Sequence, residues 1–539
     1  MQRLIFIMKS TTKTPRTKAI MSLSNAAALL VAASLMSQVL GFLRTKLVNA
    51  NFLALGPNST DAYFAAFNIP DFFYYTIAAG ALGVAFMPIL AEHLHRGDKK
   101  GIWDLSDSLM NLLAMIMAVV GIIIFVFAKP LIHYVVAPDL TPHQLHNAVM
   151  IMRFLAFNPL LFTLSGILAS VQQTFGRFFF YAIAPLFYNL SIIVSIFIFK
   201  DNLGLIGLGV GALAGGIIQL IIIAFGLINS DFHWSPKIMW QSADFRLILR
   251  NLPPRSLDQG MDQLENIVET NFARRIGPGY ISYYNNANVL QSAPTLLIGT
   301  AISTAAFPRL TNRLAQGRPD LFRSDFLKIL RVMIWITMPV VVVSFFCRGY
   351  LARLIFSRDS PQIALLFGFL TLAIFFNTMY AIISRWFYAQ KDTKTPLFVS
   401  IFTISFNIFL VYELTKPSSY GASGLALAQS LVAMTEVIIL CVIMVIRDHK
   451  LFDAKFWGGL LKILSVTGFS VLAGFIMLQI YPLSAGDRGI ITIGSKLIII
   501  SLVVFGVHLG ISGIFGLEEA RVVISKIKNI ILKPVRIEY

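Results

Sequence analysis

The residues with the clearest chemistry are four acids in one stretch, PPRSLDQGMDQLENIVETNF (253–272). They recur every three or four positions, which places side chains on one face of a helix, and they are Asp258, Asp262, Glu265 and Glu269. Neighbouring carboxylates in an apolar setting share a proton or bind a hard cation through oxygen ligands. Asn407 would add an oxygen if the fold brings it near. The stripe predicts a proton or cation site; the alternative is an internal ion pair with Arg255 that only holds the helix in place.

A second group of polar residues lies in the first hydrophobic stretch of the chain. Gln38 and Arg44 flank Gly41 at helical spacing in SQVLGFLRTK (37–46), so their side chains lie close together on the helix surface. Ionisable groups inside apolar helices are costly and usually face a cavity, which makes this pair a candidate contact for a bound molecule. The plainer alternative is that Arg44 extends its charged end to water at the edge of the apolar layer.

The next hydrophobic stretch, DAYFAAFNIPDFFYYTIAAGALGVAFMPILAEHL (61–94), adds Asp61, Asn68 and Asp71. Pro70 removes a backbone donor and predicts a kink, and two glycines further on give a second soft point. We expect a bent helix whose Asp and Asn side chains face a cleft. Asp61 follows GPNST, so a role as a helix cap is the alternative.

The elements that carry these residues are membrane helices. Hydrophobic residues make up 57% of the 539 residues and charged ones 13%, against roughly 25% charged in ordinary soluble domains. Apolar runs of about 20 residues recur, each able to cross a hydrocarbon core of about 30 Å, and they are too long for barrel strands. We expect an all-α polytopic membrane protein with about 14 transmembrane helices, near 25–50, 60–92, 105–128, 145–172, 178–199, 204–229, 248–273, 280–308, 328–347, 361–388, 396–414, 421–446, 457–480 and 489–516.

The net charge of +18 reflects topology rather than nucleic-acid binding. With the amino terminus inside, the inside loops, tails and adjoining span ends hold 29 Lys and Arg, whereas the outside loops hold 9. This bias obeys the positive-inside rule and predicts that both termini lie in the cytoplasm. The outside loop CRGYLARLIFSRDS (347–360) is the one that departs from the rule.

An internal repeat appears when the chain is compared with itself. At an offset of 220 residues Asn68 meets Asn288 and Pro88 meets Pro308. Weaker matches in the same order join VQQTFGRFFFYAIAPLFYN (171–189) to AQKDTKTPLFVSIFTISFN (389–407). Six helices per half enter the membrane in the same direction, so the pseudo-twofold axis follows the membrane normal, as in many transporters. Rocking of the halves about a central cleft would give alternating access.

The repeat predicts the organisation of the chain. We expect a basic cytoplasmic tail (1–22), an N-lobe of six helices (23–230), a C-lobe of six helices (244–447), two extra transmembrane helices (457–516) and a basic amphipathic cytoplasmic tail (517–539). The two cysteines lie far apart in hydrophobic surroundings, and nothing resembles a metal-ligand set. No phosphate-binding loop is present, so we expect neither ATP nor another cofactor beyond a coupling cation or proton.

Three motifs carry a family resemblance: VLGFLRTKLV (39–48), TDAYFAAFNIPDFF (60–73) and AAGALGVAFMPILAEH (78–93). With the six-plus-six-plus-two helix plan, they resemble the MurJ (MviN) family of lipid II flippases, within the multidrug/oligosaccharidyl-lipid/polysaccharide exporter superfamily. The resemblance implies movement of lipid II, an undecaprenyl-pyrophosphate-linked peptidoglycan precursor, from the inner to the outer leaflet of a bacterial inner membrane. Arg44 matches the arginine of the family's LGF-x-R motif, and guanidinium groups pair well with phosphate. Asp61 matches the aspartate of its DA-[FY]-F motif.

The sequence departs from the family at several cavity positions. Gln38 and Val289 stand where the family has arginines, Tyr74 and Tyr75 occupy two further arginine positions, and Ala79 replaces a glutamate. Arg255 would partly replace the missing cations. The expected substrate contacts are Gln38, Arg44, Asp61, Asn68, Tyr74, Arg255 and Asn288, and the expected coupling residues are Asp258, Asp262, Glu265, Glu269 and Asn407.

Other functions stay open from sequence. The acids favour an exporter of another lipid-linked oligosaccharide, or a drug/cation antiporter of the same superfamily. A membrane glycosyltransferase would need acidic motifs in large loops; HLHRGDKKG (93–101) is the nearest candidate and is explained by a solvated inside loop, so we expect no enzyme. Because the family's arginines are missing, a non-transporting scaffold protein is a further alternative.

Overall fold

The computed structural model describes residues 23–79, 86–228, 232, 234–356, 359–521 and 525. Its described residues form helices and connecting loops. In chain order these are α1 (Leu23–Asn51), α2 (Thr60–Tyr74), η1 (Tyr75–Ala79), α3 (Met87–His95), α4 (Lys99–Pro130), η3 (Leu131–Val136), α5 (Pro142–Leu155), α6 (Asn158–Thr174), α7 (Phe179–Phe199), α8 (Ile206–Phe225), α9 (Ala243–Ile276), α10 (Tyr280–Pro294), η4 (Thr295–Thr300), α11 (Ala301–Ala315), α12 (Pro319–Phe346), α13 (Arg348–Phe356), α14 (Ser360–Ala389), α15 (Lys394–Leu414), α16 (Ala422–Arg447), α17 (Ala454–Ile480) and α18 (Gly489–Ile514).

The all-helical membrane class is confirmed. Eleven of the described helices or helix runs are long and apolar enough to cross a membrane. Each of the 14 predicted spans overlaps a helix or a run of consecutive helices, but α1, the run from α2 to α3, and α9 are not among those eleven. The count of 14 therefore stays a prediction. The expected tail 1–22 and the glycines at 80 and 83 lie outside the described residues.

Helix irregularities follow prolines. Pro70 lies inside α2 shortly before the π-helical segment η1, whereas Pro130 and Pro294 immediately precede η3 and η4. A proline has no backbone N–H to donate, so the helix has already lost one hydrogen bond there. Changing to the wider π-helical turn nearby then costs little additional free energy. Near the predicted kink at Pro70, the irregularity in the structure is the π-helical turn η1, which begins at Tyr75.

Equivalent irregularities mark the repeat. Helix α2 begins at Thr60 and α10 at Tyr280, and η1 begins at Tyr75 and η4 at Thr295, an offset of 220 in both cases. This is the offset found in the sequence. A helix followed by a π-turn thus occurs at the equivalent position in each half of the chain.

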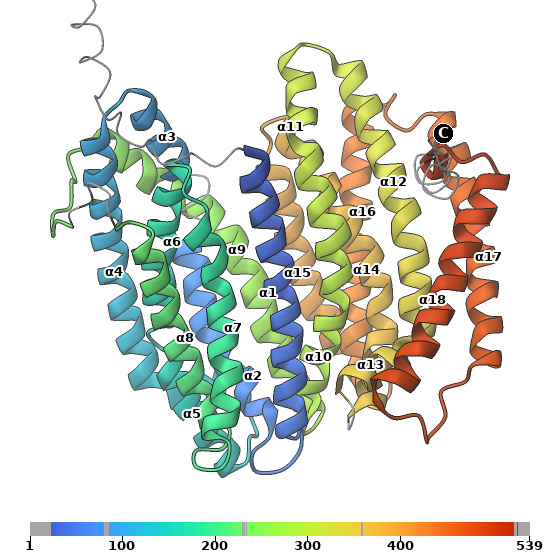
Figure 1. The fold of residues 1–539 in the computed structure, drawn as a ribbon, viewed down its shortest axis with the longest axis horizontal. Coiled ribbons are helices and arrows are strands. Elements are labelled where there is room, and N and C mark those ends of the chain that lie inside the picture. The colour runs from blue at the N-terminus through green and yellow to red at the C-terminus, as the bar shows by residue number, and fades with distance from the viewer. Residues whose placement is uncertain are drawn as a thin grey trace, which may run out of the picture.

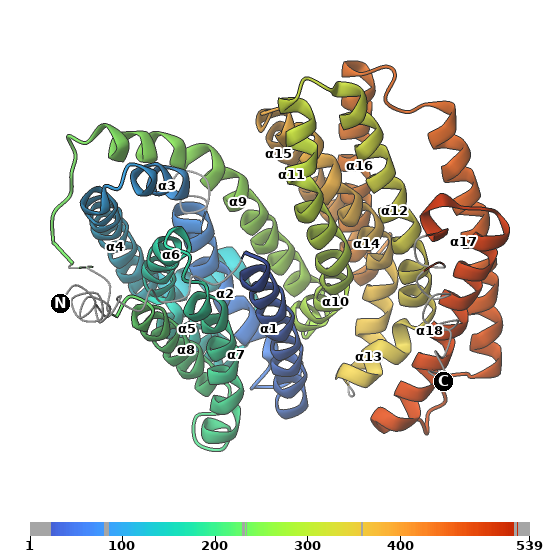
Figure 2. The same cartoon turned by 45° about the horizontal axis from the view of Figure 1, so that its top comes forward.

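The helices form two groups with α9 between them. Figure 1 shows α1 to α8 on one side, α10 to α16 on the other, and α17 with α18 at the far edge. Figure 2 shows α9 running from the first group towards the second. It packs against α2 and η1 in one group and against α10 and α15 in the other. The α9 helix therefore brings its acidic stripe to the boundary between the groups.

Buried hydrogen bonds connect the last two helices, α17 and α18, to α12. Trp335 of α12 donates to Ser512 of α18 through its indole nitrogen (2.9 Å), and the ring of His508 bonds Ser470 of α17 (3.0 Å) and the Trp335 carbonyl (3.1 Å). Buried polar groups of this kind are stabilising only when each finds a partner. The pair α17–α18 is thus an attachment to the second group, consistent with its place outside the repeat.

Candidate functional site

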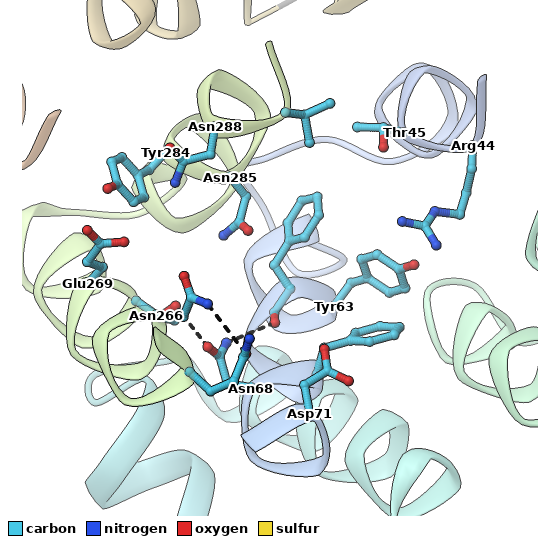
Figure 3. Close-up of a pocket in the computed structure, with 15 residues that line it drawn as sticks. Arg44, Thr45, Tyr63, Asn68, Asp71, Asn266, Glu269, Tyr284, Asn285 and Asn288 are labelled. Atoms are coloured by element: carbon cyan, nitrogen blue, oxygen red, sulfur yellow. Dashed lines mark hydrogen bonds between the residues drawn. The ribbon is translucent and has the colours of Figure 1, made fainter. Parts of the chain in front are cut away.

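A cavity of about 260 Å³ lies between the two helix groups. It is walled by α1 and α2 from the first group, by α10 from the second, and by α9. Figure 3 shows the polar side chains that point towards it. Its lining residues are Arg44, Thr45, Tyr63, Phe64, Phe67, Asn68, Asp71, Gln263, Asn266, Glu269, Thr270, Tyr284, Asn285, Asn288 and Val289.

Arg44 is the cationic residue of this lining. It stands on α1 on the opposite side of the cavity from Glu269, with Tyr63 beside it (Figure 3). Among the described residues, no carboxylate lies within ion-pair distance of its guanidinium. Asp71 lines the same cavity beyond that distance, and the half-buried guanidinium is suited to bind an anion with its fork of N–H donors.

Amide side chains supply most of the other polar groups. Asn68 accepts a hydrogen bond from Thr270 (3.3 Å) and donates to the Phe64 carbonyl (3.2 Å). Asn288, its partner in the repeat, lines the same cavity, and its side-chain oxygen is buried with no hydrogen-bond partner. Both asparagines thus reach the cleft, as the repeat predicts. Asn266 and Asn285 line it too.

Two acids of the α9 stripe meet Asn407 of α15. The Asn407 side-chain nitrogen donates to Glu265, and also to Glu269 at 3.5 Å. The oxygen of the Asn407 amide is buried without a hydrogen-bond partner, and Glu269 is only 2% exposed. The predicted cluster of two carboxylates and an amide therefore assembles inside the protein. Its spare amide oxygen is a suitable additional cation ligand.

The cluster stands in the wall between two cavities. A second cavity of about 490 Å³ lies within the second group, against η4, α11, α14 and α16, and includes Asp262 and Glu265. Glu436 also lines it and accepts a hydrogen bond from Ser400 (2.8 Å). Glu269 faces the first cavity instead, so one turn of α9 reaches both. This second cavity was not predicted from the sequence.

Asp61 lies away from both cavities and is completely buried. The helix cap of α2 is Ser59, whose hydroxyl accepts from the Asp61 amide. The Asp61 carboxylate accepts hydrogen bonds from the Gly279 amide (2.7 Å), from the amide (2.9 Å) and hydroxyl (2.7 Å) of Ser282, and from Arg274 (3.4 Å). Its observed contacts join α2 to the turn between α9 and α10, in place of the expected cleft contact.

Three further hydrogen bonds lie beside this contact and add α1 to it. Thr60 and Ser282 share a hydrogen bond of 2.7 Å, and the amides of Asn49 and Asn286 bond each other reciprocally at 3.1 and 2.8 Å. With Asp61 they form what we call the seam: a buried polar contact between α1–α2 and α9–α10. These partners are more than 200 residues apart in sequence, so no local pattern could have paired them.

The remaining expected residues are not part of the observed lining. Gln38 is exposed on α1, and Tyr74 packs its ring edge-on against Phe162 (5.6 Å). The side chains of Arg255 and Asp258 lie outside the described residues. Sequence reasoning missed Asn266, Thr270 and Asn285 of the lining; for Asn285 the repeated asparagines of YYNNANV (283–289) were the available signal.

Comparison with known proteins decides the family. Residues 50–490 match the family described as "Lipid II flippase MurJ". The chain belongs to the MurJ family. The resemblance seen in the helix motifs is thereby confirmed, and with it a transport class and a multi-span membrane protein.

Curated relatives agree. The chain is 23% identical to the probable lipid II flippase MurJ of Borreliella burgdorferi over 84% of this chain and 88% of that protein. It is 26% identical to the lipid II flippase MurJ of Burkholderia cenocepacia over 68% of this chain and 73% of that one. Similarity thus extends along most of the length of both.

Solved structures agree on the fold. A lipid II flippase MurJ in an inward closed conformation superposes with a TM-score of 0.73 at 24% identity, covering 90% of this chain and 98% of that one. An inward-facing multidrug resistance MATE family transporter of the MOP superfamily gives 0.65 at 15% identity, covering 79% and 99%. The helix arrangement is therefore shared between MurJ and MATE proteins.

Proposed function

We propose that this protein flips lipid II from the inner to the outer leaflet of the bacterial inner membrane by alternating access. The observation that carries the proposal is Arg44, a guanidinium with no carboxylate of the described residues within ion-pair distance, in a cavity between two repeated helix groups of a MurJ-family chain. Both termini lie in the cytoplasm, following the charge bias of the loops. The protein carries cargo across the membrane and catalyses no covalent reaction.

Arg44 holds the pyrophosphate of the cargo. A bidentate guanidinium–phosphate contact combines charge with direction, and a partly dehydrated site strengthens it. The amides of Asn68, Asn285 and Asn288 offer donors and acceptors to the sugar and peptide parts. Because the cavity of about 260 Å³ is below the 300–1,000 Å³ that ligands of drug size occupy, the two groups must separate to admit so large a headgroup.

The seam closes one end of the cavity. It joins the start of α2 to the start of α10, which lie on the outside face by the loop-charge assignment. Access from the outside therefore requires the bonds of Asp61, Thr60 and Asn49 to break together. The bends at η1 and η4 give each lobe a point about which its helix can flex.

Glu265, Glu269 and Asn407 form the coupling site. A shared proton or a bound cation lowers the negative charge of the two carboxylates, and its release drives the return of the carrier without ATP. The two cavities on either side of the cluster supply the routes by which the ion enters and leaves. Asp262 lines the second cavity one turn away and extends that route.

One observation favours a second candidate, an exporter of another lipid-linked oligosaccharide or a drug/cation antiporter. The cavity holds a single arginine, with Val289 and aromatic rings where further cations would strengthen phosphate binding. A cationic or neutral cargo would suit Glu269 and the asparagines better.

Complementation tests the proposal. The gene should support growth of a bacterium depleted of its own lipid II flippase, and labelled lipid II should appear in the outer leaflet of those cells. Growth failure with correctly inserted protein at normal levels would reject lipid II as the cargo and favour the second candidate.

A further inference from the structure

A polar cavity of about 280 Å³ lies at the end of the bundle where α12 begins and α18 ends. It shares no residue with the two cavities of the transport path. Basic residues outnumber acids in its lining, where Arg323, Lys328, Arg331, Lys450 and Lys455 face Asp320, Asp453 and Glu518. Arg323 pairs with Asp448, Arg331 with Glu519 and Lys455 with Glu518. Among the described residues, the unpaired positive charge of the lining is therefore that of Lys328 and Lys450, on the face that carries the inside loops.

The acids of this cavity are already engaged. Asp320 pairs with Arg323 (3.3 Å), Asp453 accepts from the Phe456 amide at the start of α17 (2.7 Å), and Glu518 pairs with Arg331 (3.4 Å). Two lysines of the lining, Lys328 and Lys450, are exposed. No carboxylate of the described residues lies within ion-pair distance of their ammonium groups. The cavity therefore presents cationic donors that the protein itself leaves unneutralised.

An apolar groove of about 460 Å³ continues from this cavity into the membrane. Helices α12, α14, α16 and α17, with the α16–α17 connection, supply its lining, which consists of Leu330, Ile334, Phe375, Met379, Ile383, Val437, Ile438, Cys441, Val442, Val445, Ile446, Phe452, Phe456, Trp457 and Leu460. Phe456 lines both spaces. Val437 lies ten residues before Arg447, the end of α16, so the groove reaches about 15 Å inward. That is half of a hydrocarbon core of about 30 Å, the depth of one leaflet.

Arg331 fixes the junction of the two spaces. Its guanidinium lies against Gly459 of α17, where an added Cβ would come within 3.0 Å of it, and it pairs with the buried Glu519. Leu330, the preceding residue, lines the groove, whereas Arg331 lines the polar cavity. A charged compartment and an apolar compartment thus meet at one rigid boundary, the arrangement that an amphiphile requires.

We infer that the polar cavity and the apolar groove together form a binding site for an anionic glycerophospholipid of the inner leaflet. Its phosphate headgroup lies among Lys328, Lys450 and Lys455, and its acyl chains fill the groove. Basic pockets between transmembrane helices on the cytoplasmic side select anionic headgroups for this reason, and the groove accounts for a lipid rather than a soluble anion. The site is separate from the cargo cavity, so the inference does not depend on the identity of the cargo.

Trp457 provides a direct reporter because its ring lines the groove and is 53% exposed. The full-length protein is reconstituted in phosphatidylcholine vesicles that contain a small fraction of phosphatidylglycerol with dibrominated acyl chains, which quench tryptophan on contact. The difference from a Trp457→Phe variant isolates this residue from the other five tryptophans. We expect quenching by brominated phosphatidylglycerol to exceed that by brominated phosphatidylcholine at equal mole fraction.

Lysine variants test the headgroup contact. The double variant Lys328→Gln, Lys450→Gln should bind phosphatidylglycerol about 25-fold more weakly, since each basic residue near a membrane surface contributes about fivefold. The matched double variant Lys391→Gln, Lys394→Gln, exposed at the same end of the bundle but outside the site, should bind it normally. Equal quenching by both brominated lipids, or no loss in the first double variant, would overturn the inference. Displacement of the lipid by millimolar inorganic phosphate would identify a soluble-anion site instead, and displacement by traces of polyprenyl phosphate would identify a cargo-tail site.

Discussion

Asp61→Asn tests the seam most directly. The carboxylate accepts four hydrogen bonds in a site with no exposure, one of them from Arg274. Asparagine keeps one acceptor oxygen but turns an NH₂ group towards donors, and it leaves the buried guanidinium without its counter-ion. Removing one partner of a buried ion pair costs about 3–5 kcal/mol, which changes the ratio of closed to open states by about 150- to 5,000-fold. We therefore expect Asp61→Asn to open the outside end.

Spin labels across the seam measure this opening. Leu55 approaches Gly279 so closely that an added Cβ there would lie 3.0 Å from it, so labels at Leu55 and Pro278 report a short distance when the seam is closed. Cys347 and Cys441 are first replaced by alanine. Asp61→Asn should shift the distribution to long distances, whereas Asp201→Asn, an exposed aspartate in a turn, should leave it unchanged.

An unchanged distribution in folded Asp61→Asn protein would refute the role of the seam. Thermal unfolding measured on the same samples separates opening from loss of the fold. If Asp61→Asn does not fold, Ser282→Ala is the milder test. It removes one hydrogen bond to the charged group, worth about 1.5–3 kcal/mol, together with the bond between Ser282 and Thr60, and should open the same end to a smaller extent.

Three further predictions concern the cavity. Arg44→Ala should abolish complementation at normal membrane levels and weaken cargo binding about 10- to 150-fold, the equivalent of about 1.5–3 kcal/mol for a lost charge-assisted bond; full activity would contradict a cargo contact. Cysteines at Asn68 and Asn288 should crosslink in one transport state only, and a yield that stays constant with cargo and membrane potential, while transport survives, would reject rocking. The double variant Glu265→Gln, Glu269→Gln should bind cargo yet lose dependence on an ion or proton gradient; retained dependence would remove coupling from this helix, and low expression would indicate a structural pair.

The helices were predictable because their signals are local. Apolar runs, loop charge and the offset of 220 depend only on composition and order, and the offset reappears in α2 and α10 at Thr60 and Tyr280. The π-turn of η1 was not predictable in form, since a proline indicates where a helix bends and not how. The break of the predicted span 145–172 into α5 and α6 was missed for the same reason.

The site was predictable where the helix period alone places a residue. Glu265 and Glu269 follow from spacing, and Asn407 was expected as a conditional third member because only the fold could bring α15 to α9. Asp61 shows the limit of this reasoning. Its motif position indicated importance, but its partners Arg274 and Ser282 lie more than 200 residues away, so neither the expected cleft contact nor the alternative helix cap describes the contact that its carboxylate makes.

Opposite charges in one cavity explain how cargo and coupling ion can act on each other. Arg44 and Glu269 line the same space from opposite sides, so a pyrophosphate that is attracted by the first is repelled by the second. In the proposed mechanism, a proton or cation held by Glu269 and Glu265 reduces that repulsion and favours cargo binding. Linkage is reciprocal, so bound cargo must in turn strengthen the hold on the ion. Coupling between the cargo and the ion therefore needs no long-range structural change, because the Coulomb interaction between them within the cavity is sufficient.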